Sequence, residues 1–294
     1  MKLFIAGGTG FVGGHLTAEL LKRGHQLVLL SHSGSGTAEA GVSLVKGDVT
    51  DPASYSTAMK GCDAVINLVG IIREFPAKGI TFERLHVEAT ASMVQAAQHA
   101  GVLRYLQMSA LGTRLDAVSG YHRSKWRAEE LVRGSSLAWT IFRPSLIFGP
   151  KDAFVNMLAA NLRLAPVMPT MGDGNYRLQP IHGADVARCF ADALDKPETA
   201  GQIYELCGED RLTYRHVLDT IADALGRRHP WKPALPLSLM KPVIKTLQGI
   251  SAFPITMDQL QMLLEENICN GCWRETFPFE PIRFRDGIRE YLTP

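Results

Sequence analysis

The sequence predicts an α/β protein built on a doubly wound parallel sheet, with a smaller, mostly helical lobe at its carboxyl-terminal end. Two observations lead to this prediction. Short apolar runs alternate with longer helix-patterned segments through the first half of the chain, which is typical of strand-helix-strand crossovers. The strand segments are apolar at consecutive residues rather than at alternate ones, as expected of a sheet that helices cover on both faces.

The expected elements can be placed along the chain. Strands are expected at Leu3–Ala6, Gln26–Leu30, Ser43–Lys46, Ala64–Leu68, Arg104–Met108, Ala138–Arg143 and Gln202–Leu206. Helices are expected at Phe11–Arg23, Ser54–Met59, Phe82–Ala100, Tyr121–Arg133 and Ala184–Leu194. Crossovers between parallel strands are right-handed, so these segments should form one continuous twisted sheet.

The regular alternation of apolar runs and helix-patterned segments ends after Pro150. Residues 151–175 contain a helix and then a stretch rich in proline and glycine, and residues 211–294 contain helices and many prolines. We therefore expect residues 1–150, rejoined by about 176–210, to form the sheet domain. The two remaining segments should form a small lobe over the mouth of the sheet.

The composition excludes several classes of protein. The chain has 294 residues, 46% of them hydrophobic, and a net charge of +2, which indicates a folded domain and no nucleic-acid partner. It has no run of about 18 apolar residues and no signal-peptide pattern, so we expect a cytoplasmic protein without a transmembrane segment. Peripheral association with a complex at the inner face of the membrane is left open.

The chain has five cysteines, of which only Cys269 and Cys272 show a suggestive Cys-x-x-Cys spacing. A metal site needs a second ligand pair, and none is evident, so no metal is expected. We expect all five to be ordinary, partly buried thiols in a reducing compartment.

The strongest functional signal is a glycine loop that follows the first strand and opens the first helix. Gly7 permits a tight turn, Gly10 lets the backbone approach a pyrophosphate, and Gly13 allows the helix to pack closely on the strand. This is the dinucleotide-binding fingerprint of the Rossmann fold, in which the phosphates lie at a helix N-terminus. The residues of this loop that we expect to bind the cofactor are Gly7, Thr9, Gly10, Phe11, Val12 and Gly13.

The end of the second strand indicates which dinucleotide is bound. A carboxylate there accepts hydrogen bonds from the ribose 2′-hydroxyl of NAD and repels the 2′-phosphate of NADP. The chain has Ser31, His32 and Ser33 instead, all able to hydrogen-bond a phosphate, and no arginine. We therefore predict that NADP(H) is preferred and that NAD(H) remains an alternative. His32 could equally be a solvated loop residue.

A series of further motifs, in this order and spacing, resembles the extended or atypical short-chain dehydrogenase/reductase family, which includes NAD-dependent epimerases and dehydratases. The matching segments are Gly7–Gly13, Gly47–Asp51, Asn67–Gly70, Tyr121–Lys125, Arg143–Pro150 and Gln179–Ala187. The resemblance implies further cofactor-binding residues: Asp48 and Val49 at the adenine, Leu68, Val69 and Gly70 along the loop after the fourth strand, and Arg143 and Pro144 beside the nicotinamide.

Four segments narrow the resemblance to the subgroup of the Rossmann-type accessory subunit of mitochondrial complex I (NADH:ubiquinone oxidoreductase) and its bacterial relatives. They are Asn67–Ile71, His86–Ala89, Ser109–Gly112 and Pro254–Leu263.

The resemblance also implies a catalytic set of Tyr121, Lys125 and Ser109. Tyr121 and Lys125 lie four residues apart on a predicted helix and therefore on one face. In the family the tyrosine exchanges a proton with the substrate, while the lysine lowers the tyrosine pKa and binds the nicotinamide ribose. Two positions depart from the family pattern. Ser109 is the nearest match to the catalytic hydroxyl, and His86 replaces the usual asparagine.

Two functions stay open. The first is an NADP(H)-preferring oxidoreductase or epimerase/dehydratase that acts on an unidentified small molecule. The second is a non-catalytic, cofactor-binding accessory or assembly subunit of a respiratory complex, in which the dinucleotide stabilises the fold. Cofactor that survives purification but is never turned over would distinguish the second from the first. A homodimer is a further open expectation.

The apolar segment from Ala234 to Gly249 also has two interpretations. It contains Lys241 and Lys245, and Pro242 interrupts its helical pattern. It could dock on a membrane complex or a quinone-type substrate, or it could be a lid that packs on the sheet domain. The few positive charges favour the lid.

Overall fold

The computed structural model describes residues 1–34, 40–250, 253 and 255–293. Its centre is a seven-stranded parallel sheet of strand order β11-β6-β5-β4-β1-β2-β3. The strands are β1 (Lys2–Ala6), β2 (Gln26–Ser31), β3 (Val42–Lys46), β4 (Ala64–Asn67), β5 (Arg104–Met108), β6 (Ala138–Pro144) and β11 (Gln202–Leu206). All seven predicted strands are present, and the order reverses at β1 and β4, where a doubly wound sheet binds its ligand.

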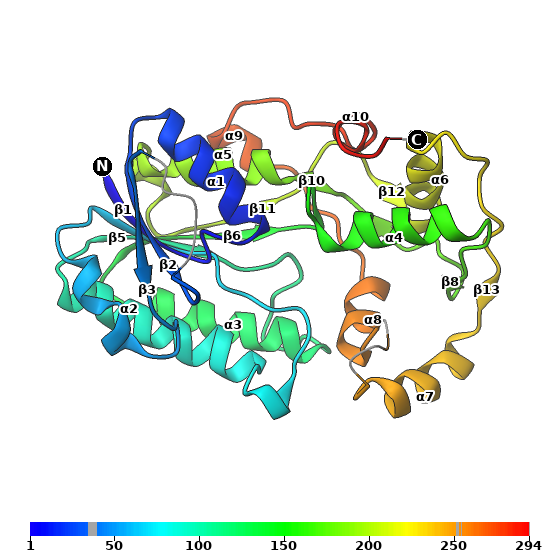
Figure 1. Ribbon diagram of the computed structural model, residues 1–294, viewed down its shortest axis with the longest axis horizontal. Helices are drawn as coiled ribbons and strands as arrows, with labels where there is room; N and C mark the ends of the chain where they lie inside the picture. The colour runs from blue at the N-terminus through cyan, green and yellow to red at the C-terminus, as the bar shows by residue number, and fades with distance from the viewer. Residues whose placement is uncertain (35–39, 251–252, 254, 294) are drawn as a thin grey trace.

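Helices cover both faces of the sheet, as Figure 1 shows. On one face lie α1 (Phe11–Lys22) and α5 (Gly183–Leu194), which pack against each other. On the other lie α2 (Ala89–His99) and α3 (Gly120–Arg133). The predicted fold class, a Rossmann-type α/β sheet with a smaller helical lobe, is therefore confirmed.

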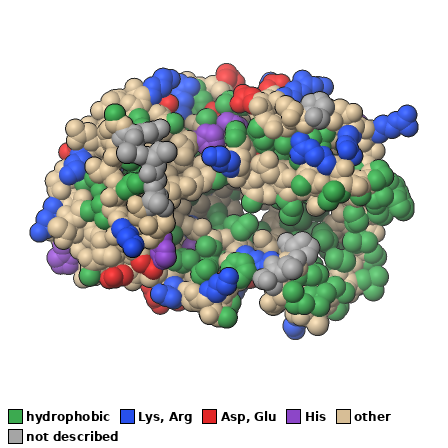
Figure 2. Space-filling view, viewed as in Figure 1, with side chains coloured by type: hydrophobic (Ala, Val, Ile, Leu, Met, Phe, Trp, Pro, Cys, Tyr) green, Lys and Arg blue, Asp and Glu red, His purple; other side chains and the backbone are tan. Residues whose placement is uncertain are grey.

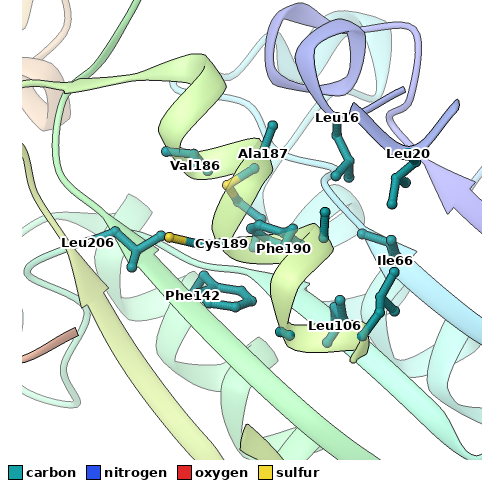
Figure 3. Close-up of a cluster of buried hydrophobic side chains, with 14 of the residues drawn as sticks. Leu16, Leu20, Ile66, Leu106, Phe142, Val186, Ala187, Cys189, Phe190 and Leu206 are labelled. Atoms are coloured by element: carbon teal, nitrogen blue, oxygen red, sulfur yellow. The ribbon is translucent and has the colours of Figure 1, made fainter. Parts of the chain in front are cut away.

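The strands are apolar at consecutive residues because each face of the sheet has its own core. Leu3 and Ile5 of β1 belong to the core under α1 and α5, whereas Phe4 and Ala6 belong to the core under α2. In the first core the rings of Phe142 and Phe190 lie 4.3 Å apart between β6 and α5 (Figure 3). Side chains alternate along a strand, so burial of both faces requires an uninterrupted apolar run.

Two helical segments differ from the prediction. Residues Ser54–Met59 do not form one helix: two 3₁₀ turns cover Pro52–Ser54 and Ser56–Met59, and Tyr55 separates them. The expected helix Phe82–Ala100 begins with a π-helical segment, Glu83–Glu88, before α2 continues it. π-Helical turns often occur at functional sites, and this one contains His86.

The carboxyl-terminal lobe has a hydrophobic core of its own, in which Phe148 packs with α4 (Ala153–Leu164), α6 (Tyr214–Ala224) and α10 (Phe284–Arg289). The remaining helices are α7 (Leu237–Leu247), α8 (Met257–Leu264) and α9 (Trp273–Thr276). Short strands complete the lobe: β7 (Ile147–Phe148), β8 (Thr170–Met171), β9 (Arg177–Leu178), β10 (Ile181–His182), β12 (Leu212–Thr213) and β13 (Ala234–Leu235). Figure 1 shows α7 and α8 beside the α3 end of the sheet domain.

The structure corrects the prediction that all five cysteines are free. Cys207 follows β11 and is disulfide-bonded to Cys269, whereas Cys272 is an exposed thiol. The sequence separation of 62 residues hid this pairing, because tertiary packing alone brings the two segments together. The Cys-x-x-Cys spacing therefore does not mark a bonded pair.

In the part of the chain that the structure describes, no helix is both long enough and apolar enough to cross a membrane.

Candidate cofactor and active site

The glycine loop has the geometry that phosphate binding requires. Gly7 has a φ of +80°, and its carbonyl accepts a 3.0 Å hydrogen bond from the Gly10 N–H. A Cβ at Gly13 would collide with the carbonyls of Gly7 and Gly8. No side chain caps the N-terminus of α1 at Gly10, so its first amides are available to an anion. These observations fit a dinucleotide pyrophosphate.

A cavity of about 610 Å³ adjoins this loop, and the loop residues Thr9, Gly10 and Phe11 line part of it. Its other wall includes Lys151, which has a left-handed φ of 71°, and Ala184 of α5. Val12 is partly buried against the sheet core.

The nucleotide edge of the site is formed by the ends of β2 and β3. Ser31 is buried, with its hydroxyl 3.4 Å from that of Ser33, while the His32 ring is exposed with Nε2 3.9 Å from the Asp48 carboxylate. Lys46 pairs with Ser31 across the strands, and its stem runs within 3.0–3.1 Å of where a Cβ on Gly34 would lie.

The residues predicted to contact the adenine follow β3. The Asp48 carboxylate accepts 2.8 Å hydrogen bonds from the Thr50 N–H and hydroxyl. The backbone hydrogen bond from Thr50 is the largest cause of its lowered pKa. Val49 is partly buried against the core under α2. Asp48 is therefore held in a fixed, ionised form at the edge of the sheet.

Lys125 lies at the centre of the predicted active site and is only 3% exposed. Its ammonium donates to the carbonyls of Val69, at 3.2 Å, and Met108, at 3.3 Å. Val69 follows β4 and Met108 is the last residue of β5, so the cation lies between the carboxyl ends of two adjacent strands. Burial lowers the Lys125 pKa to about 8. The third ammonium proton is available to a ligand hydroxyl.

Gly70 lets the cofactor loop pass close to this ammonium. A Cβ at Gly70 would lie 2.9 Å from Nζ of Lys125, so any larger residue would displace the cation. The preceding loop residues are held as well: the Val69 N–H donates to Asn67 Oδ1 at 3.1 Å, and Leu68 packs on the sheet core.

Tyr121 lies one helical turn before Lys125 and belongs to an aromatic cluster. Its ring meets those of Phe82 and His86 edge-on, at centroid distances of 5.9 and 5.5 Å. Ile71 and Met262 of α8 pack against this cluster. Burial raises the Tyr121 pKa to about 12, so the ligand-free tyrosine is protonated at neutral pH.

His86 holds two parts of the site together. Its Nε2 accepts a 3.1 Å hydrogen bond from the Ile71 N–H, so in the neutral ring Nδ1 carries the proton and donates to Ser124 at 2.8 Å. The Ser124 hydroxyl in turn donates to the Tyr121 carbonyl at 2.7 Å. Burial lowers the His86 pKa to about 2, so this histidine is neutral and acts as a structural link.

Ser109 is buried directly after β5, and its hydroxyl donates to Thr113 at 3.3 Å. Thr113, which the sequence analysis did not select, is also buried. The Ser109 hydroxyl is therefore paired with that of Thr113 in the protein interior. Thr113 carries the first side-chain hydroxyl after Ser109 in the sequence, and this feature could have identified it.

The Arg143 side chain is committed to an ion pair. Its guanidinium makes bonds of 2.8 and 2.6 Å to the fully buried carboxylate of Glu129, one turn after Lys125 on α3. Pro144 ends β6 and is buried. The position of Arg143 beside a nicotinamide would thus be fixed by Glu129, a residue that the sequence analysis missed.

The structure brings Tyr121, Lys125 and Gly70 together and places the glycine loop at β1, next to β4. Ser31, His32 and Ser33 lie at the carboxyl end of β2, on the side of β1 that faces away from β4. This arrangement is that of an elongated dinucleotide site running along the carboxyl ends of the strands, with Tyr121 at the end where Met262 of α8 packs.

Comparison with known proteins agrees with this class. The family model described as NAD(P)H-binding matches residues 7–197, and the chain belongs to this family. A protein of Arabidopsis thaliana named NADH dehydrogenase [ubiquinone] 1 alpha subcomplex subunit 9, mitochondrial, is 31% identical over 81% of this chain and 61% of its own length. The chain thus spans about three fifths of this relative.

Two further proteins are similar to this chain, one in sequence and one in fold. A Caulobacter vibrioides protein named ceramide reductase is 30% identical over 62% of this chain and 57% of its own length. A solved structure of DesIV, a dTDP-glucose 4,6-dehydratase from Streptomyces venezuelae with NAD and TYD bound, superposes with a TM-score of 0.78 over 99% of this chain and 96% of that one. Its identity of 21% supports the fold alone. The predicted resemblance to complex I subunits is confirmed in sequence, and the resemblance to epimerase/dehydratase-type proteins is confirmed in fold.

Proposed function

We propose that this protein is an NADP(H)-dependent oxidoreductase that reduces a carbonyl group on a small molecule. The observation that carries the proposal is the buried Lys125 ammonium, fixed by the Val69 and Met108 carbonyls one helical turn from Tyr121. Burial disfavours the charged form of Lys125, and a lysine that stabilises a phenolate and binds a ribose hydroxyl would need this position.

The side chains of the protein would supply a proton to the substrate and stabilise the charge that its transfer leaves behind. When bound, the reduced nicotinamide supplies a hydride to the substrate carbonyl carbon. The Tyr121 hydroxyl would donate its proton to the carbonyl oxygen, so that the carbonyl becomes an alcohol and the tyrosine becomes a phenolate. The Lys125 ammonium would stabilise that phenolate, and the Ser109–Thr113 pair would orient the oxygen.

The preference for NADP(H) rests on the chemistry at the ends of β2 and β3. Ser31 and Ser33 offer hydroxyls, no carboxylate follows β2 directly, and Lys46 adds a cation beside Ser31. Lys46 would therefore lie near the 2′-phosphate and favour its binding.

The surroundings of Tyr121 support an apolar substrate. Phe82 and Tyr121 form a buried apolar cluster, and Ile71 and Met262 pack against it. We propose that residues 151–175 and 211–294 form a separate substrate-side lobe, with α8 as its nearest helix. The relative named ceramide reductase supports an apolar carbonyl compound as substrate.

The test combines binding with turnover. Dinucleotide released from the purified protein is identified by mass spectrometry, and the protein is titrated with NADPH and NADH. Oxidation of NADPH is then followed with a panel of apolar ketones and aldehydes. Tighter binding of NADPH than NADH and turnover that disappears in Tyr121→Phe support the proposal. Turnover that Tyr121→Phe leaves intact would refute the assigned role.

A second function, an accessory or assembly subunit of a respiratory complex, is supported by the relative named as a subunit of NADH dehydrogenase [ubiquinone]. The replacement of the usual asparagine by His86 fits a site that binds cofactor without turnover. NADPH that binds tightly and is never oxidised by any carbonyl compound would favour this function. In either case we propose a cytoplasmic protein that associates peripherally with the inner face of the membrane.

A further inference from the structure

Lys151 is an exposed residue on the wall of the cavity beside the glycine loop. The lining includes Thr9, Gly10 and Phe11 on one side and Pro150 and Lys151 on the other. Figure 2 shows histidine side chains and a basic side chain together in the middle of this face, just above a hollow. The cavity therefore has a lysine opposite the loop whose geometry fits a dinucleotide pyrophosphate.

The backbone of Lys151 is strained. Its φ of 71° is the only left-handed value at a non-glycine residue in the described part of the chain. Glycine, asparagine and aspartate adopt this conformation readily, whereas a lysine does so only at a cost in free energy. Residues held in this way are concentrated at ligand-binding and active sites, so the conformation of Lys151 needs an explanation from function.

The turn that carries Lys151 is fixed on both sides. The Asp152 N–H donates to the Gly149 carbonyl at 3.0 Å. The buried Asp152 carboxylate accepts hydrogen bonds from the N–H groups of Gly149, at 3.3 Å, and Val155, at 2.6 Å. The Tyr291 hydroxyl donates to the same carboxylate at 3.0 Å. The backbone of Lys151 therefore cannot relax unless this network breaks.

Gly149 brings the turn against the N-terminal end of α1. A Cβ at Gly149 would lie 3.4 Å from Cε2 of Phe11 and 3.4 Å from Nε2 of His15. Phe11 is the first residue of α1, and no side chain caps this end of the helix. Lys151 comes two residues after Gly149 and lines the same cavity as Phe11, so its side chain lies near the uncapped amides.

A buried hydrogen-bond donor beside the same turn has no partner. His182 is 3% exposed, and its Nδ1 accepts a 3.2 Å hydrogen bond from the Ala184 N–H, so in the neutral ring Nε2 carries the proton. No described residue accepts this proton. Nε2 lies 3.2 Å from where Gly149 would carry a Cβ, and the His182 ring meets that of His15 in the cavity wall at 5.4 Å. This wall therefore offers a donor, which suits an acceptor oxygen.

The charges of the lining single out Lys151 as the cation for an anionic ligand. Glu19, the acidic residue of the lining, is paired with Arg23 at 2.7 Å. Lys22 lies at the opposite end of α1, roughly 17 Å along the helix from Phe11. Lys151 makes no ion pair with any described residue, so its charge is available to a ligand.

We propose that the Lys151 ammonium binds the pyrophosphate of the dinucleotide from the wall opposite the glycine loop. The loop supplies backbone amides and a helix N-terminus but no cation, and the pyrophosphate carries negative charge on both phosphates. The lysine adds a charge-assisted hydrogen bond, which explains why a strained position keeps this residue. NADPH and NADH share the pyrophosphate, so the contact serves both. The inference rests on the dinucleotide binding of the proposed function and not on turnover.

The test is calorimetric titration of the full chain with NADPH, NADH and ADP, which keeps the pyrophosphate and lacks the nicotinamide. Lys151→Met should weaken binding of all three about tenfold, because the pyrophosphate loses its counter-charge. Lys151→Arg keeps the charge and should bind within about twofold of wild type. The matched control is Lys22→Met, which removes the other lysine of the lining and should bind like wild type. Thermal unfolding should show the same Tm for Lys151→Met and wild type, so that the loss is not misfolding.

Several results would overturn the proposal. One is wild-type affinity in Lys151→Met, and another is an equal loss in Lys22→Met, which a general charge effect would explain. A loss in Lys151→Arg as large as in Lys151→Met would show that charge is not what matters. Weakening of NADPH alone would place the ammonium at the 2′-phosphate, and unchanged ADP binding would place it at the nicotinamide half. A wild type that binds dinucleotide without turnover, or without preference for NADPH, would contradict the proposed function and leave this comparison of affinities intact.

Discussion

α5 and α7 are both apolar, but they use their apolar residues differently. α5 buries Val186, Phe190 and Leu194 against the sheet and α1. α7 buries Ile244 alone and leaves Leu239 and Val243 in contact with solvent. The comparison teaches that apolar residues in the sheet domain are explained by internal packing. In the lobe, several apolar residues such as Leu239 and Val243 are not explained by internal packing.

The largest expected effect is at the glycine loop of the sheet domain. Gly13→Val should abolish dinucleotide binding, because its side chain would collide with the Gly7 and Gly8 carbonyls and displace the loop. The matched variant is Gly14→Ala, where a Cβ meets nothing within 4 Å. It should bind normally and raise stability by up to about 1 kcal/mol. Calorimetric titration with NADPH and thermal unfolding check both, and equal binding by the two variants would contradict the assigned phosphate site.

The difference between the two helices can be measured directly as stability. Phe190→Ala should destabilise the protein by about 3–5 kcal/mol, because it removes a fully buried ring that packs against the ring of Phe142. Leu239→Ala on α7 should change the free energy of unfolding by no more than about 0.5 kcal/mol. Urea unfolding measures both values. A large loss at Leu239 would mean that α7 is part of the folding core, and the comparison would fail.

The next prediction concerns the buried cation. The reductase role needs Lys125 charged, and its pKa is about 8, so turnover and NADPH affinity should fall as the pH rises through about 8. Lys125→Met should reduce turnover about a hundredfold and remove this pH dependence. Lys60→Met, at an exposed lysine, serves as the control. A pH profile that is the same in Lys125→Met and wild type would show that another group titrates.

The smallest expected effect is on the choice of cofactor. Lys46→Met should weaken NADPH binding about tenfold and leave NADH binding unchanged, since only the 2′-phosphate loses its counter-charge. Isothermal titration with NADPH and NADH distinguishes two ways in which this prediction could be wrong. If wild type shows no preference for NADPH, the cofactor proposal is wrong. If it does, and Lys46→Met keeps it, the phosphate is bound by other groups.

The sheet could be predicted from the sequence because its signals are local. Each strand is a short, continuous apolar run between turn residues, and the glycine loop joins one strand to one helix. The least accurate predictions were at Ser54–Met59 and Phe82–Ala100, where the helical pattern was correct but the hydrogen bonding was not. The spacing of apolar residues barely distinguishes an α-helix from 3₁₀ or π turns over so few residues.

Site residues that lie on the same helix or strand could be predicted from the sequence. Site residues that come together from different helices and strands could not. Tyr121 and Lys125 are one helical turn apart, so their common face follows from spacing. Glu129, Thr113 and Lys46 act through neighbours on other strands or turns and carry no motif of their own. The roles of the predicted site residues stay predictions until the variants above are measured.

The sequence by itself determined the family, the doubly wound sheet and the position of the dinucleotide loop, because the order of strands, helices and glycines is a local property of the chain. Only the tertiary structure decided that Cys207 meets Cys269, that Glu129 holds Arg143, and that α7 keeps one apolar side uncovered. These three facts depend on which distant segments pack together. Packing of that kind is set by the whole fold, and no short stretch of sequence records it.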